Sequence, residues 1–318
     1  MISESIEMDR AWIAAQRPPR QIALNPFQPH AFFLEKERNA SGRICDSATI
    51  LLTNKECPWR CLMCDLWRNT LTESVPPGAI PRQIELALAQ LGAVFDQIKL
   101  YNSGSFFDSA AIPLADYGSI ARTVASSKHV VVESHPRLIG ERALQFRDLL
   151  AGTLEVAMGL ETIHPQILPR LNKKFDLNHF ASAVEYLRRE NISVRAFVLV
   201  KTPFMNETEG AEWAVKSARF AFDCGANVVS LIPTRAGNGA LDRLQERNEF
   251  APPQLPTVER AFEGVLNLNA GRAFVDTWDL AKFSRCPACF TERRHRLQAI
   301  NLSQTTVPRI ECVRCGGL

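Results

Sequence analysis

The sequence predicts an α/β fold, specifically a partial (β/α)6 TIM-like barrel with a small C-terminal metal-binding module. Short apolar runs rich in Val, Ile, Leu and Phe alternate with longer stretches whose apolar residues recur every three or four positions. That alternation is the pattern of parallel strands joined by helices. The chain has 318 residues, of which 46% are hydrophobic and 22% charged, so one main domain can bury a large core.

Six strands are expected, each apolar enough to be buried on both faces: 48–54, 97–101, 129–133, 154–158, 194–200 and 227–232. Helical periodicity places helices between them at 81–91, 114–125, 141–150, 178–189 and 208–223, with Asp176 or Asn178 as the cap of the fourth. A helix at 257–268 and a strand at 272–276 would close the domain. A doubly wound open sheet is the alternative, and in either fold the loops after the strands carry the site.

Three segments are predicted along the chain. Residues 1–42 contain four prolines and form an irregular N-terminal arm, residues 43–280 form the core domain, and residues 281–318 form the four-cysteine module. The module has seven Lys or Arg against two Glu, a charge of +5, whereas the whole chain carries +3. This basic segment indicates a polyanionic partner, with simple solvation of the charges as the alternative.

The composition also indicates a location. No run approaches the ~20 apolar residues of a membrane span, and the first residues are acidic rather than basic and apolar. We therefore expect a cytoplasmic protein without a membrane partner. Seven of the nine cysteines fall in closely spaced groups, which in a reducing compartment indicates metal ligation rather than disulfides.

The first cysteine group, Cys57, Cys61 and Cys64, has the spacing C-x3-C-x2-C and follows the first predicted strand. A [4Fe–4S] cluster normally takes four thiolates, so three cysteines on one loop leave one iron open to a cofactor or substrate. The alternative is a structural zinc site that uses Cys45 or Asp65 as its fourth ligand.

This loop, together with later strand ends, resembles the radical S-adenosylmethionine (radical SAM) superfamily. The supporting segments are Val131-Val132-Glu133-Ser134-His135-Pro136-Arg137, Val156-Ala157-Met158-Gly159-Leu160-Glu161 and Leu168-Pro169-Arg170-Leu171-Asn172-Lys173. They are similar to elongator-like, methylthiotransferase-like and archaeosine-synthase-like members. The resemblance covers roughly residues 45–235, most of the chain.

The resemblance implies cofactors and a reaction. Cys57, Cys61 and Cys64 would hold the [4Fe–4S] cluster, S-adenosyl-L-methionine (SAM) would bind the open iron, and its reductive cleavage would give a 5′-deoxyadenosyl radical. An electron donor such as a flavodoxin or ferredoxin is implied. For SAM contacts the resemblance suggests Asn102, Ser103 and Gly104, in a turn where the family usually has Gly-Gly-Glu, with Glu133, Glu161 and Arg195; Lys201 is an alternative to Arg195.

A second cysteine group consists of Cys286, Cys289, Cys312 and Cys315, two C-x2-C pairs separated by 22 residues. Four thiolates make a closed tetrahedral site, and zinc with a structural role is the first interpretation. An auxiliary iron–sulfur cluster is the alternative.

The sequence therefore predicts a radical SAM enzyme whose substrate is not specified. The basic module and the resemblance favour RNA or nucleoside modification over a small molecule or peptide, and a non-catalytic iron–sulfur or zinc scaffold is a third hypothesis. Residues that follow strands and could meet a substrate are His135, His164, Arg235, Asn238 and the run Asp276-Thr277-Trp278-Asp279, in which two acids flank a tryptophan.

Overall fold

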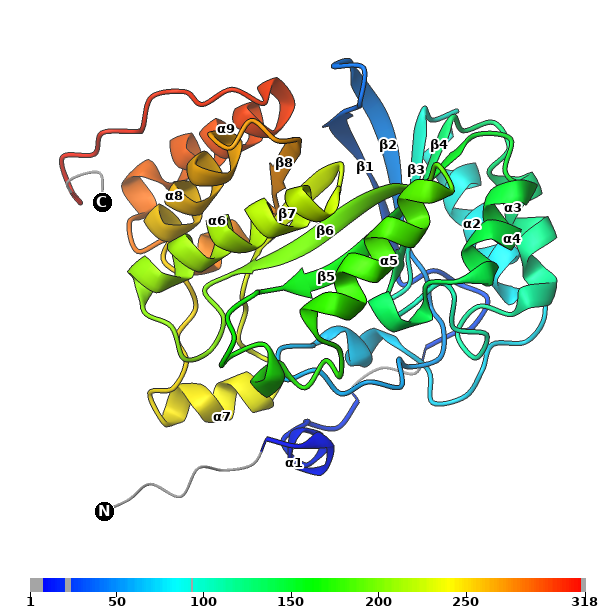
Figure 1. Cartoon of the computed structure of the whole chain (residues 1–318), viewed down its shortest axis with the longest axis horizontal. Coiled ribbons are helices and arrows are strands. Elements are labelled where there is room, and N and C mark those ends of the chain that lie inside the picture. The colour runs from blue at the N-terminus through cyan, green and yellow to red at the C-terminus, as the bar shows by residue number, and fades with distance from the viewer. Residues whose placement is uncertain (1–7, 21–23, 93, 316–318) are drawn as a thin grey trace.

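The computed structural model describes residues 8–20, 24–92 and 94–315, and within them the strands form one eight-stranded sheet ordered β1 to β8. The sheet curls into a half-barrel (Figure 1). Strands β2 to β8 are parallel, and β1 pairs antiparallel with β2. The strands are β1 Ala31–Arg38, β2 Ile44–Leu51, β3 Gln97–Tyr101, β4 His129–Ser134, β5 Thr153–Glu161, β6 Ser193–Val200, β7 Val228–Pro233 and β8 Arg272–Val275.

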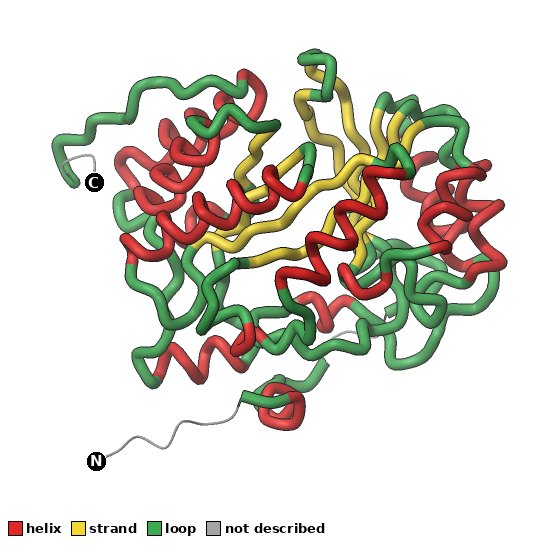
Figure 2. Tube along the Cα trace, in the orientation of Figure 1, coloured by secondary structure: helices red, strands yellow, loops and turns green. Residues whose placement is uncertain are grey.

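Helices between the parallel strands cover the convex face of the sheet (Figures 1 and 2). Their apolar sides pack on strand residues that alternate with those of the concave face, such as Ile98, Leu100, Val130 and Val132. The helices are α1 Arg10–Ala15, α2 Ala79–Leu91, α3 Tyr117–Thr123, α4 Glu141–Leu149, α5 Leu177–Arg189, α6 Glu207–Cys224, α7 Ala240–Glu246, α8 Leu255–Leu266 and α9 Pro287–Ser303.

The predicted barrel is confirmed, and the six predicted strands correspond to β2 to β7. Asp176 is the cap of α5, where its carboxylate accepts the backbone N–H of His179 at 2.9 Å.

The structure differs from the prediction at β1, a segment that the sequence analysis assigned to an irregular arm. The charged residues of this segment make it look like an exposed arm in the sequence, but Glu35 and Glu37 both pair with Lys99 on the concave face, and the Glu37 side chain is only 6% exposed. Helices α7 and α9 were not predicted either.

The amino end of the concave face is filled by buried charges, which we call the ionic layer. Arg195 lies between Glu37 and Glu155, with 2.6 Å from its guanidinium to a carboxylate oxygen of each. The Arg195 side chain is 3% exposed and the Glu155 side chain 0%. Burial opposes the charge on Glu155, but Arg195 outweighs it and lowers the pKa of that carboxyl to about 2. The layer consists of the buried Glu37, Lys99, Glu155 and Arg195 together with the partly exposed Glu35 and Arg272.

The free edge of β8 is covered by α9. The Asn301 amide accepts the Val275 N–H and donates to the Val275 carbonyl, both at 2.9 Å, and Gln304 makes the equivalent pair with Ala273 at 2.8 and 2.7 Å. Two side-chain amides therefore replace a neighbouring strand, so that the edge has no unpaired backbone groups at these residues. This fastens the C-terminal module to the barrel.

The ionic layer gives a stability prediction. Arg195→Met should lower the free energy of unfolding by about 3–5 kcal/mol, because two buried carboxylates each lose one charged partner. The control Lys36→Ala breaks a pair with Asp46 in which both side chains are 63% exposed, and should cost less than about 1 kcal/mol. Urea unfolding followed by circular dichroism measures both, and equal small effects would contradict the assigned role of Arg195.

Candidate functional site

The segment 54–65, which we call the cysteine loop, leaves the carboxyl end of β2 and carries three half-buried thiols, Cys57, Cys61 and Cys64. Burial raises the pKa of each thiol to about 12. The backbone N–H groups of Trp59 and Leu66 are directed at Cys57 and Cys64 and oppose this rise. Such amides stabilise thiolate sulfur, as metal-bound cysteines require.

Two asparagines from other strand ends hold the cysteine loop in place. Asn172, after β5, donates its amide to the Arg60 carbonyl at 2.6 Å. Asn238, after β7, donates to the carbonyls of Leu62 at 2.8 Å and Cys64 at 3.3 Å. Both asparagines are buried. The spacing of the three cysteines in space therefore depends on residues more than 100 positions away in the sequence.

The N-terminal segment packs against the outer side of the cysteine loop. Glu56 accepts hydrogen bonds from Arg17 and Arg20, each at 2.6 Å, and pairs with Arg60. Helix α1 lies beside α7 (Figure 1), and Ile13 shares an apolar cluster with Leu62, Leu171, Ala240, Leu241 and Leu244. These contacts shield one side of the loop from water.

The turn Asn102-Ser103-Gly104-Ser105 after β3 lies directly beside the cysteine loop. A Cβ on Gly104 would stand 3.3 Å from the Cβ of Cys57. The Glu133 carboxylate, from β4, accepts the N–H of Asn102 at 2.6 Å and of Gly104 at 3.4 Å. Burial raises the pKa of Glu133 to about 7, although these hydrogen bonds favour the charged carboxylate and oppose the rise. The 102–105 turn has no carboxylate in its own sequence, and Glu133 from β4 places one against the backbone of the turn.

The same turn contains an unsatisfied polar group. Asn102 is fully buried, and neither its amide oxygen nor its amide nitrogen has a hydrogen-bond partner. A buried amide left without partners costs free energy unless a ligand satisfies it. The turn lies beside Cys57, so a polar ligand at the cysteine loop would satisfy this amide.

On the β5 side of the loop, Glu161 and Lys173 form a buried ion pair at 2.6 Å. Glu161 has a left-handed backbone (φ 65°), and a Cβ at Gly159 would collide with both the carboxylate and the ammonium. Burial opposes the charge on Lys173, but Glu161 and the nearby Cys61 thiol outweigh it and raise the pKa of the lysine. Lys173 is thus a cation held close to the cysteines, and its role was not predicted.

Two of the predicted residues have other partners. Arg195 belongs to the ionic layer at the amino end of the sheet, where Glu37 and Glu155 bind its guanidinium. Lys201 pairs with Glu207 of α6 at 2.5 Å. All three cations are paired with carboxylates, but Lys173 is the one whose charge interacts with the Cys61 thiol, so it is the candidate cation at the cysteine loop.

His135 packs against the cysteine loop. Its ring stacks on Trp59 of the cysteine loop, with centroids 3.8 Å apart. Nε2 lies 2.9 Å from the Lys173 carbonyl, and Nδ1 accepts the Arg137 N–H at 3.2 Å. Burial and Lys173 lower its pKa to about 3, so the neutral ring has both nitrogens engaged.

The C-terminal cysteines converge on one point. The sulfurs of Cys286 and Cys312 lie 3.9 Å apart, those of Cys289 and Cys315 lie 3.8 Å apart, and all four are within 4.8 Å of one another. Among the His, Cys, Asp and Glu side chains of the described residues, these four cysteines are close enough to one another to share one ion. The site can therefore hold a metal.

The basic residues beside this site are mostly neutralised. Arg293 and Arg296 are buried and pair with Glu259 and Glu263 of α8, and Arg309 pairs with Glu263 at 2.6 Å. The predicted polyanion-binding charge of the module is correspondingly reduced, because these arginines fasten α9 and the tail to α8.

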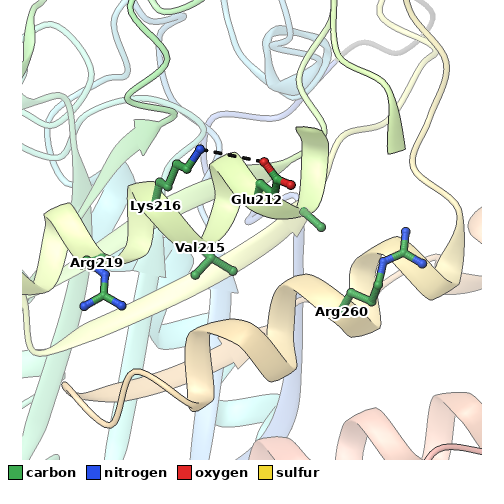
Figure 3. Close-up of a pocket in the computed structure, with 6 residues that line it drawn as sticks. Glu212, Val215, Lys216, Arg219 and Arg260 are labelled. Atoms are coloured by element: carbon green, nitrogen blue, oxygen red, sulfur yellow. Dashed lines mark ion pairs between the residues drawn. The ribbon is translucent and has the colours of Figure 1, made fainter. Parts of the chain in front are cut away.

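A surface groove of about 390 Å³ lies between α6 and α8 (Figure 3). Its polar lining includes Arg219, Arg260 and Lys216, which is 3.9 Å from Glu212. The groove contains none of the predicted site residues and is on the helical layer outside the sheet. We therefore place the site at the cysteine loop.

No family model matches the chain. An uncharacterized protein of Methanocaldococcus jannaschii is 24% identical, over 76% of this chain and 70% of that protein. Archaeosine synthase subunit beta of Methanosarcina acetivorans is also 24% identical, over 65% of this chain and 63% of that protein. The sequence likeness thus extends over most of the chain.

Among solved structures, Elp3 of Methanocaldococcus infernus has a TM-score of 0.52 and 15% identity, over 73% of this chain and 60% of that chain. The radical S-adenosylmethionine methyltransferase TsrM of Kitasatospora setae, with cobalamin and a [4Fe–4S] cluster bound, has a TM-score of 0.51 and 14% identity, over 81% of this chain and 61% of that chain. The chain therefore has the fold of radical SAM enzymes. It spans less than two thirds of the length of these two structures and of archaeosine synthase subunit beta.

The anchoring of the cysteine loop gives a second prediction. Asn238→Ala should lower the iron retained after anaerobic reconstitution, because two buried carbonyls of the loop lose their donor at a cost of about 1–3 kcal/mol. The matched control is Asn178→Ala, at an exposed position on α5. Iron is measured by colorimetric assay, and equal iron in the two variants would show that the loop does not depend on Asn238.

Proposed function

We propose that this protein is a radical SAM enzyme in which Cys57, Cys61 and Cys64 hold a [4Fe–4S] cluster with one open iron. One observation carries the proposal: at the carboxyl end of the sheet, three thiols lie on a loop beside the buried amide of Asn102, which has no hydrogen-bond partner. Three thiolates with a polar ligand site beside them suit a cluster that binds a cofactor, whereas a structural site would be closed by a fourth ligand.

The residues around the cysteine loop would orient SAM. The turn Asn102-Ser103-Gly104, held by Glu133, offers an amide and backbone groups to the amino group of SAM. Lys173 would attract its carboxylate, with Glu161 keeping the lysine charged and in place. Bound SAM and a reduced cluster supply homolytic cleavage of a carbon–sulfur bond, which releases methionine and a 5′-deoxyadenosyl radical.

Other residues would protect this chemistry from water and oxygen. Leu62 and Trp67 are buried in or next to the cysteine loop, and Trp59 is fixed by its stack on His135. The segment containing α1 covers the loop from outside. An electron donor such as a flavodoxin or ferredoxin in the cytoplasm would reduce the cluster. Among the described residues no helix has the length and apolarity that a bilayer span requires.

For the substrate, we propose RNA or a nucleoside. The support is the likeness to archaeosine synthase subunit beta, whose name denotes one subunit of an enzyme that makes a modified nucleoside, and a partner subunit is part of the same proposal. A small molecule or peptide is the alternative, and binding that weakens steeply with salt would favour RNA over it. A non-catalytic scaffold would bind the cluster without cleaving SAM.

At the C-terminal cysteines we propose zinc. A tetrahedron with Zn–S bonds of ~2.3 Å has sulfurs about 3.8 Å apart, and the two closest pairs are 3.9 and 3.8 Å apart. The thiolates of a [4Fe–4S] cluster bind four different irons and lie farther apart. Hydrogen bonds from the backbone of Cys315 and Arg314 lower the pKa of Cys312 to about 7, which suits a thiolate ligand.

The enzymatic proposal predicts a product. Reconstituted protein with SAM and dithionite should form 5′-deoxyadenosine, and Cys61→Ala should abolish it, because the cluster loses one of three ligands. The control Cys224→Ala, at a cysteine outside both groups, should retain the activity. Product formation is measured by chromatography. Undiminished product from the Cys61 variant would refute the ligand assignment.

The metal proposal predicts a stoichiometry. The anaerobically purified protein should contain about four irons and one zinc. Cys289→Ser should lose the zinc and keep the iron, whereas Cys61→Ala should lose iron and keep zinc. Inductively coupled plasma mass spectrometry measures both metals, and about eight irons without zinc would contradict zinc at the module.

A further inference from the structure

A polar and aromatic group lies where β7 and β8 end, and neither the cluster nor the proposed SAM contacts use it. The Arg235 guanidinium donates to the Asp276 carboxylate at 2.6 Å and to the Trp278 carbonyl at 2.7 Å. The backbone N–H of Trp278 donates to the other carboxylate oxygen of Asp276 at 2.8 Å. Asp276 itself is tied to the sheet, because its N–H donates to the Leu231 carbonyl at 2.8 Å.

Hydrogen bonds hold these residues in place, and some of their donors and acceptors are still available to a ligand. Arg235 makes both bonds through one terminal nitrogen, so donors remain on a guanidinium that has five, and the Arg235 side chain is 20% exposed. The Asp276 side chain is 31% exposed, and each carboxylate oxygen can accept a further hydrogen bond. A ligand can therefore reach an acceptor that is adjacent to a donor.

Aromatic rings adjoin this polar pair. Trp278 is 58% exposed, so much of its indole ring is accessible to a ligand. Its ring lies 5.4 Å from that of Phe33. Phe33 faces the concave side, because it is two residues from Glu35, which pairs with Lys99 of the ionic layer. The exposed indole thus stands at the mouth of the half-barrel.

The group is close to the cysteine loop. Arg235 and Asn238 are three residues apart in one loop, and Asn238 binds the carbonyls of Leu62 and Cys64. Three residues span at most about 11 Å. In addition, Arg68, just after the cysteine loop, donates to the Gly237 carbonyl. A ligand bound at Asp276 would therefore lie within reach of chemistry that begins at the cluster.

We propose that Trp278, Asp276 and Arg235 recognise a purine base of the substrate whose edge has two adjacent N–H donors next to a carbonyl, as guanine has. Trp278 stacks on the flat ring. The Asp276 carboxylate accepts the two N–H groups, and Arg235 donates to the carbonyl. Adenine, cytosine and uracil lack two adjacent donors, so the pair also selects the base. This inference rests on the proposed function and specifies the substrate class of that site.

The test is anaerobic equilibrium binding to the cluster-loaded protein, with guanosine, adenosine and uridine monophosphates as one set of probes and unfractionated tRNA as the other. Guanosine monophosphate should bind most tightly of the three nucleotides. Asp276→Asn should weaken it roughly 5- to 150-fold and remove the base preference, because an amide nitrogen then faces N–H donors. Trp278→Ala should weaken every base, whereas Trp278→Phe should retain stacking.

The control is Asp279→Asn, an exposed acid three residues after Asp276 that pairs only with Lys282 in the described structure, and it should bind as the wild type does. If only tRNA binds, with the same dependence on Asp276 and Trp278, the base is recognised within RNA. Wild-type affinity in both Asp276→Asn and Trp278→Ala, or no binding of either probe set, would overturn the proposal. Formation of 5′-deoxyadenosine by the wild type without any probe reports on the proposed function separately.

Discussion

Two side-chain amides hold the cysteine loop, and the proposed chemistry depends on them. A loop that must present three thiols to one cluster has no secondary structure of its own to fix their spacing. Asn172 and Asn238 bind its carbonyls from the ends of β5 and β7, and Glu56 fixes its outer side through arginines of the N-terminal segment. The positions of distant strand ends thus fix the geometry of the three cysteines.

The two ends of the strands serve different purposes. At the amino end, the ionic layer fills the concave face with paired charges that are almost inaccessible to water. At the carboxyl end, Asn102 and the Glu161–Lys173 pair surround the cysteine loop with polar groups, one of them unsatisfied. Paired charges thus fill the end of the strands that carries no candidate site, whereas the buried Asn102 amide without partners lies beside the cysteine loop. The C-terminal module closes the free edge of the sheet through Asn301 and Gln304.

Much of this arrangement could be predicted from the sequence, since apolar runs identify the strands and the cysteine spacing is local. Strand β1 could not, because Glu35 and Glu37 look solvated until Lys99 and Arg195 are placed opposite them. Arg195 was assigned to SAM for the same reason: a cation in a strand gives no sign of which end of the barrel it faces. Lys173 was missed although its segment was noticed, because only the folded chain brings it onto Glu161. The role of Glu133 beneath the 102–105 turn is likewise a contact between neighbouring strands.

The central claim is that the cluster on Cys57, Cys61 and Cys64 has an open iron that SAM occupies. Electron paramagnetic resonance of the dithionite-reduced protein, recorded with and without SAM, tests it most directly. The account predicts a [4Fe–4S]⁺ signal whose g values change when SAM is added, with nuclear coupling from ¹⁵N in the amino group of labelled SAM. A signal that SAM leaves unchanged would show that the fourth iron is not available to it, and would contradict the account.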